Sequence, residues 1–269
     1  MKTTRRMPSF ESVSGGATAT LRMPIGLTYH QLLINYSGIT LAQMDEIRLI
    51  ANGQLVRRYT SGEQLDNINQ FQGRAAANGI LIFDFERYGL NTRAARELTA
   101  FGTGVEQDPQ RVTTLTLEID INSAATSPVL SAEAIQSNAT VLGAINLVRN
   151  FSYNAPSVGE YEISDLPKGN LINQARFENA NISKIKVERN NYIIFERSKA
   201  ENDLIQSDGK RVPTAAAYVI DPTEVGDGAE GLATRNVQGQ VVQDLRFVLT
   251  MSAAGDVPLC VDYIGGLSG

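Results

Sequence analysis

The chain has 269 residues, 42% of them hydrophobic and 20% charged, which is enough apolar material for one large or two ordinary globular domains. Its net charge is −5 and its pI is near 5.1, and this balance argues against sequence-specific nucleic-acid binding as its main role. The single histidine, His30, excludes metal and catalytic sites that need several imidazoles.

The chain begins with a basic segment, residues 1–6, that carries Lys2, Arg5 and Arg6. Small and polar residues follow it instead of an apolar run, so it does not have the pattern of a signal peptide. We interpret it as an exposed arm whose default state is disorder, and we expect deletion of residues 1–14 to leave the rest of the protein folded. Alternatively, its three positive charges contact an anionic surface such as lipid headgroups.

The first half is predicted to consist of short strands with a few short helices. Alternating or apolar runs indicate the strands, and turn residues such as Pro24 and Gly38 separate them. No run of about 18 apolar residues indicates a transmembrane helix. The expected strands are 17–23, 29–36, 46–50, 54–59, 80–85 and 112–121, and the expected helical segments are 40–44, 62–70 and 92–100.

A small, polar stretch that stops at Pro128 is the expected junction between two domains, 1–126 and 127–269. A short helix at 131–137 is expected to follow it. The chain ends in a tail, 257–264. We expect Cys260 to be a small buried hydrophobe in the last strand that forms no internal disulfide. The expected strands of the second half are 140–148, 160–163, 171–177, 183–189, 192–197, 212–220 and 241–251.

A hairpin followed by a helix occurs once in each half. Asn52-Gly53 and Asn190-Asn191, separated by 190 − 52 = 138 positions, are pairs that can take the positive φ angles of a tight turn. After each hairpin a serine, Ser61 or Ser198, precedes a Gln or Glu by three positions, which is a helix-capping signal. We infer two copies of one domain, each ending on a matching strand.

Many short strands separated by turn signals argue for β-sandwiches. Each half has the length of one jelly roll, in which two four-stranded sheets enclose a shared core. The predicted fold is therefore all-β, with two jelly-roll β-sandwiches side by side and a few short helices.

We predict no catalytic site. The chain has no nucleophile elbow, Walker A loop or CxxC pair. The carboxylates of Asp84 and Glu86, or of Glu118 and Asp120, share a strand face and could converge, but such pairs are more often solvated charges.

The best candidate for ligand binding is the acidic, glycine-containing loop 221–230. Its carboxylates, above all Asp221, Glu224 and Asp227, could supply the hard oxygen ligands that Ca²⁺ prefers, although their spacing is not that of an EF-hand. The alternative is a solvated acidic loop.

The length, the duplicated plan, the opening MKTTRRMPSFESVSGGATATLRMP and the small-residue tail resemble the major capsid protein of corticoviruses. These are tailless icosahedral phages of marine bacteria with a lipid membrane inside the shell. The resemblance covers the whole chain without a short diagnostic motif. It implies a structural protein of the virion capsid, made in the host cytoplasm, whose two jelly rolls stand perpendicular to the capsid surface.

The resemblance also implies the partners. These are a homotrimer of pseudo-hexagonal outline, neighbouring trimers, other virion proteins, and the viral lipid membrane through the N-terminal region. It further implies that Ca²⁺ assists virion stability, which strengthens the calcium prediction for the acidic loop.

Two rival functions stay open at this point. One is a carbohydrate-binding or adhesion module of two β-sandwiches, which is weakened because the chain has no Trp and its aromatics lie mostly in strand patterns. The other is a jelly-roll hydrolase that uses a carboxylate pair, which would need two carboxylates roughly 5–10 Å apart in a deep cleft.

Overall fold

A computed structural model describes residues 1–226 and 230–267 of the chain. The chain divides into two compact units. Unit 1 is Met1–Val148 together with the short stretch that begins at Gly265, and unit 2 is Arg149–Ile264. None of the helices in the described residues is long and apolar enough to cross a membrane.

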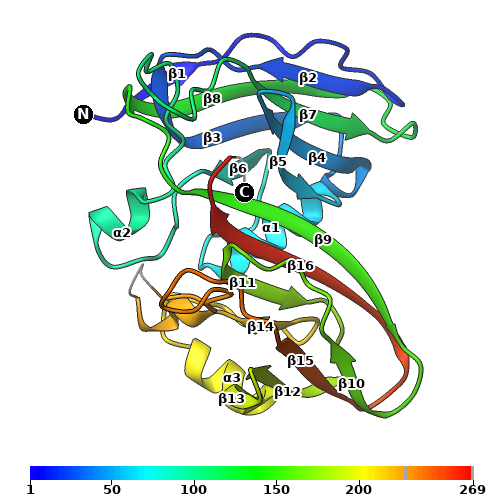
Figure 1. The fold of residues 1–269 in the computed structure, drawn as a ribbon. Coiled ribbons are helices and arrows are strands. Elements are labelled where there is room, and N and C mark those ends of the chain that lie inside the picture. Colours follow the sequence, from blue (N-terminus) through cyan, green and yellow to red (C-terminus); the bar gives the residue numbers. More distant parts are fainter. Residues whose placement is uncertain (227–229, 268–269) are drawn as a thin grey trace. The chain divides into compact units, whose positions relative to one another are not determined.

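In unit 1 the strands pair antiparallel in two runs of four, with the orders β1-β8-β3-β6 and β5-β4-β7-β2. Figure 1 shows β3 and β8, the most extensively paired strands of the first sheet, running next to each other. The strands are β1 (Thr3–Arg6), β2 (Thr18–Arg22), β3 (Leu27–Ser37), β4 (Met44–Ala51), β5 (Gln54–Tyr59), β6 (Ile80–Asp84), β7 (Leu115–Ile121) and β8 (Val129–Asn138), and the helices are η1 (Leu41–Gln43), α1 (Gly62–Phe71) and α2 (Arg93–Glu97).

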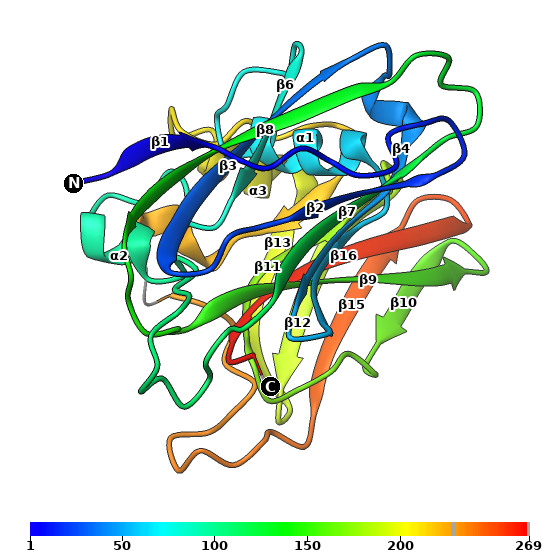
Figure 2. The same ribbon diagram turned by 90° about the horizontal axis from the view of Figure 1, so that it is seen from above.

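Unit 2 has the same plan, with the orders β9-β16-β11-β14 and β10-β15-β12-β13. Figure 2 shows β10 and β15 of the second sheet side by side. Counted from the first strand of each unit, both units have the orders 1-8-3-6 and 2-7-4-5, so the predicted double jelly roll is confirmed. The strands are β9 (Ile145–Ala155), whose first residues belong to unit 1, β10 (Gly159–Ile163), β11 (Leu171–Phe177), β12 (Ile182–Arg189), β13 (Tyr192–Ser198), β14 (Tyr218–Ile220), β15 (Leu245–Met251) and β16 (Gly255–Gly265), and the helices are α3 (Lys199–Gln206) and η2 (Pro222–Val225).

Alternating strands enclose an aromatic cluster in the core of unit 1. Every second residue of β7 is buried, because successive side chains of a strand point to opposite faces. The ring of Phe85 lies 5.7 Å from Tyr29, 5.2 Å from Phe83 and 5.7 Å from Phe101, measured between centroids. These four side chains are fully buried and form one cluster in the core of unit 1.

Both predicted hairpins are present with the expected turns. Asn52 and Asn190 have φ angles of 50°, and the residues that follow them, Gly53 and Asn191, also have positive φ angles. Each hairpin leads to a capped helix, since Ser61 accepts a hydrogen bond from the backbone of Gln64, and Ser198 forms a full capping box.

The structure corrects three expectations. The units divide after Val148 and not after residue 126, because the polar stretch before Pro128 is only the turn from β7 to β8. Residues 131–137 are strand and not helix, since Ala132 and Ala134 are inward positions of a two-residue alternation. The segment 257–264, expected as a tail, is part of the eighth strand, β16. The expectation that Cys260 is buried in the last strand is confirmed, and burial raises the pKa of its thiol.

Candidate functional site

The basic N-terminal segment is a strand of the first jelly roll and not a disordered arm. All four residues of β1 pair with β8, and the Met7 backbone N–H then donates to the carbonyl of Ala132 at 2.9 Å. Arg5 and Arg6 lie exposed on this strand. The sequence concealed the strand because its four residues are all exposed and show no apolar alternation.

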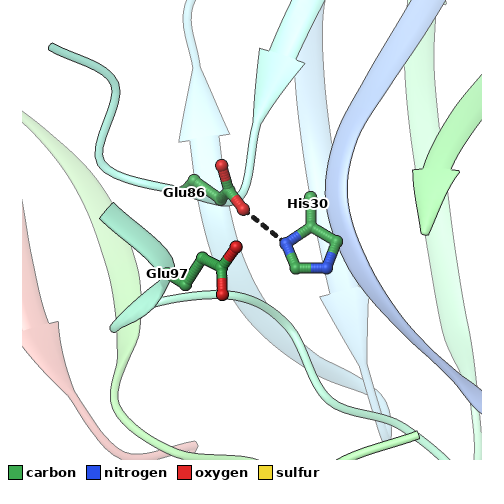
Figure 3. A group of neighbouring side chains, drawn as sticks. All are labelled: His30, Glu86 and Glu97. Carbon is green, nitrogen blue, oxygen red and sulfur yellow. Dashed lines mark hydrogen bonds and ion pairs between the residues drawn. The ribbon is translucent and has the colours of Figure 1, made fainter. Parts of the chain in front are cut away.

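Lys2, just ahead of β1, is anchored in a cluster of ionisable side chains. Its ammonium group donates to Glu86 in a short hydrogen bond and lies 3.0 Å from a carboxylate oxygen of Glu97. Figure 3 shows the two carboxylates beside the buried ring of His30, whose Nδ1 is bonded to Glu86. The other ring nitrogen of His30 lies 2.7 Å from the Ser137 hydroxyl of β8. His30 is therefore a buried residue with a hydrogen-bond partner at each ring nitrogen.

Three segments far apart in the sequence bring this cluster together. His30 is the extra residue at a bulge where β3 pairs with β8, and bulges redirect side chains. Its carbonyl accepts the backbone N–H groups of Phe85 at 2.9 Å and Glu86 at 3.3 Å, which holds the segment after β6 close to β3. Glu97 is the last residue of α2, a helix capped by Thr92. No local motif links these positions, so sequence reasoning did not find the cluster.

The electrostatics of the cluster favour a bound positive charge. Burial raises the pKa of Glu86, but hydrogen bonds from His30 and Lys2 together outweigh it and hold that pKa below its usual range. The pKa of Glu97 is lowered in the same way, by Arg93 and Lys2 against burial. Ligand atoms of His30, Glu86 and Glu97 lie within 4.8 Å of one another, the spacing of a metal site. The Lys2 ammonium supplies the cation here, so the cluster anchors the N-terminus.

The structure places two of the three predicted calcium ligands against arginines. One oxygen of the buried Asp221 carboxylate accepts a hydrogen bond from Arg211 at 2.6 Å. The other oxygen accepts from the backbone N–H and the hydroxyl of Thr223. Both oxygens of Glu224 accept from Arg197, at 3.0 and 2.7 Å. These carboxylates do not fit a hard cation in this arrangement, since arginine donors already engage them. Asp227 lies outside the described residues, and calcium binding stays a prediction.

The carboxylate pairs considered for catalysis are also engaged by basic side chains. Arg48 lies 3.1 Å from Glu118 and 2.7 Å from Asp120, so this pair converges on a cation within its own sheet. Asp84 lies 2.8 Å from Arg74. Both arrangements support a structural role for these acidic side chains.

Comparison with known proteins covers both units. Residues 4–139 match the model of the viral coat protein P2 N-terminal domain, and residues 145–267 match that of the viral coat protein P2 C-terminal domain. The chain is 27% identical to the major capsid protein P2 of Pseudoalteromonas phage PM2 over 98% of this chain and 97% of that one.

Solved structures show the same fold. The crystal structure of the bacteriophage PM2 protein P2 matches with a TM-score of 0.90 at 26% identity, over 99% of this chain and 98% of that one. A protein in the atomic structure of Sulfolobus Turreted Icosahedral Virus matches with a TM-score of 0.67 at 10% identity, over 98% and 90% of the two chains. At that identity the likeness concerns the fold alone.

Proposed function

The chain belongs to the viral coat protein P2 family, and we propose that it forms homotrimers that tile an icosahedral shell around an internal lipid membrane. Its relationship to the PM2 protein over nearly the whole of both chains makes it a structural protein of a virion capsid. The observation that carries the finer proposal is the duplication of one jelly roll, with the same strand order, within this capsid-protein chain.

Duplication favours a trimer for a geometric reason. A ring of three chains presents six similar units, which gives a nearly hexagonal outline that can tile a surface. In a closed ring each chain contacts its two neighbours through two different surfaces. A chain with two similar units can supply one such surface from each unit.

The exposed arginines of β1 support contact with an anionic membrane. Lys2 is held by Glu86 and Glu97, so Arg5 and Arg6 carry the available charge. Each basic residue near an anionic surface contributes about 1 kcal/mol, so two per chain give about 2 kcal/mol and three chains give about 6 kcal/mol. One chain alone would bind weakly, whereas a trimer would bind firmly.

The trimer is tested by light scattering on the purified protein. A mass near three times 29.2 kDa is expected, and electron microscopy of concentrated samples with anionic vesicles should then show closed shells. A protein that stays at 29.2 kDa at every concentration would contradict the proposal.

Membrane contact is tested by flotation with phosphatidylglycerol-containing vesicles. The double variant Arg5→Gln/Arg6→Gln should lose binding, and added salt should weaken wild-type binding because exposed charges are screened. A matched control, Arg22→Gln/Arg111→Gln, removes the same charge from other partly exposed sites of unit 1 and should bind like the wild type. Equal binding by all three proteins would rule out the role assigned to β1.

A further inference from the structure

Unit 2 has an exposed apolar edge on the strand β13 and the helix α3 that follows it. We call this surface the β13 edge patch and define it as Tyr192, Ile193, Ile194, Leu204 and Ile205. Their exposed fractions are 76%, 55%, 37%, 77% and 47%, respectively. Within the described residues β13 pairs with β12 alone, so its other edge has no strand partner. Exposed apolar edges of this kind attract other chains unless they are covered.

The matching edge of unit 1 shows how such an edge is covered. Val56 and Ile194 are equivalent, since 194 − 56 = 138, and each is the extra residue at a bulge in its hairpin. In unit 1 this edge has a second pairing partner at one residue, since Arg57 of β5 pairs in parallel with Val148 of β9. Val56 is 1% exposed, whereas Ile194 is 37% exposed. The same structural position is therefore closed in one copy of the fold and open in the other.

The helix that follows the hairpin is also more apolar on its exposed side in unit 2 than in unit 1. Aligned on their caps, Ser61 and Ser198, Asn67 of α1 corresponds to Leu204 of α3. Both positions are exposed, but the one in unit 2 carries a leucine. An apolar side chain at an exposed helix position beside an open strand edge is typical of a surface that another protein covers.

An open cavity lies behind the same strand. It has a volume of about 300 Å³ and a mixed lining. Apolar residues such as Ile194, Phe195 and Leu232 lie beside the charged residues Arg189, Asp221, Glu224 and Glu230. A cavity of this size and mixed lining, next to an exposed apolar edge, can receive a protruding side chain of a partner that carries both apolar and polar groups.

We propose that the β13 edge patch is the surface by which unit 2 binds a second copy of this chain. This inference rests on the proposed function, since it assigns the surface that holds neighbouring copies together. A second copy is the occupant that the chain itself indicates, because the equivalent edge of unit 1 is closed by a strand of this same protein.

The test replaces exposed apolar residues of the patch with charged ones. The variants Ile193→Asp and Leu204→Glu alter side chains that are more than half exposed, so their melting temperatures should stay near that of the wild type. Association, followed by light scattering over a concentration series, should weaken at least tenfold because each variant brings an unpaired charge into an apolar contact. The controls Val158→Glu and Val237→Glu place the same charge on exposed valines outside the patch and should associate like the wild type.

The outcomes separate this inference from the proposed function. A wild-type protein that never associates overturns both. A wild-type trimer with unchanged association in Ile193→Asp and Leu204→Glu overturns only the assignment of the surface. Hydrogen exchange of the unmodified protein gives a second readout that does not depend on variants folding. The backbone amides of β13 should become protected on going from dilute monomer to concentrated oligomer, and an oligomer without such protection would mean that the patch binds something else.

Discussion

Removal of residues 1–7 tests the finding that the N-terminal segment is part of the fold. The truncation removes β1, the buried side chain of Met7 and the Lys2 anchor. Burial of one methionine side chain contributes about 1.5–3 kcal/mol. The partly exposed ion pairs of Lys2 add about 1 kcal/mol after solvent screening is considered.

The backbone hydrogen bonds of β1 add little to this sum, because each contributes about 0.5–1.5 kcal/mol and ordering each residue costs about 1–2 kcal/mol. The net loss is therefore about 2–4 kcal/mol, which corresponds to a fall of about 5–15 °C in the melting temperature of unit 1. Calorimetry measures this shift, and hydrogen exchange should show faster exchange in β8, which becomes an edge strand. A truncated protein that melts within about 1 °C of the wild type would refute the reasoning and restore the interpretation of a dispensable arm.

Further predictions concern other parts of the chain. The folded state holds the pKa of Glu86 below its usual value, so ionised Glu86 stabilises the fold at pH values above the usual pKa of a glutamate. This contribution is lost as the pH falls through the lowered pKa. Glu86→Gln should therefore flatten the acid side of the profile of unfolding free energy against pH, measured by chemical denaturation. Phe85→Ala should cost about 3–5 kcal/mol, because it empties the centre of the aromatic cluster, and an unchanged denaturation midpoint would contradict that packing. Ser198→Ala should cost about 1 kcal/mol through loss of the α3 cap, as measured by the same method, whereas Ser198→Asp should retain most of it. Asp221→Asn should destabilise the protein by about 1.5–3 kcal/mol even in a chelator, because it removes one of the two carboxylates that bind the buried Arg211 and leaves only Asp208. Destabilisation that occurs only when calcium is present would instead support the predicted calcium site.

Sequence patterns predicted the parts of the fold that depend on local interactions. The turns at Asn52-Gly53 and Asn190-Asn191 follow from which residues tolerate positive φ, and the caps at Ser61 and Ser198 follow from bonds that span three residues. The alternation of β7 likewise identified its inward face. These signals repeat at nearly one spacing, so they were sufficient to identify a duplicated β-sandwich.

Tertiary structure alone decided which segments meet. β1 has no apolar alternation, so its place depends on pairing with β8, more than 120 positions away in the chain. His30, Glu86 and Glu97 converge only because a bulge redirects one residue and two separate segments close around it. The equivalent residues Val56 and Ile194 differ in exposure, 1% against 37%, and only the first lies on a strand that has a second pairing partner, β9, within the described residues. Local sequence encodes the conformation of each strand, whereas coverage and clustering depend on neighbours that are distant in sequence and are set only when the sheets close.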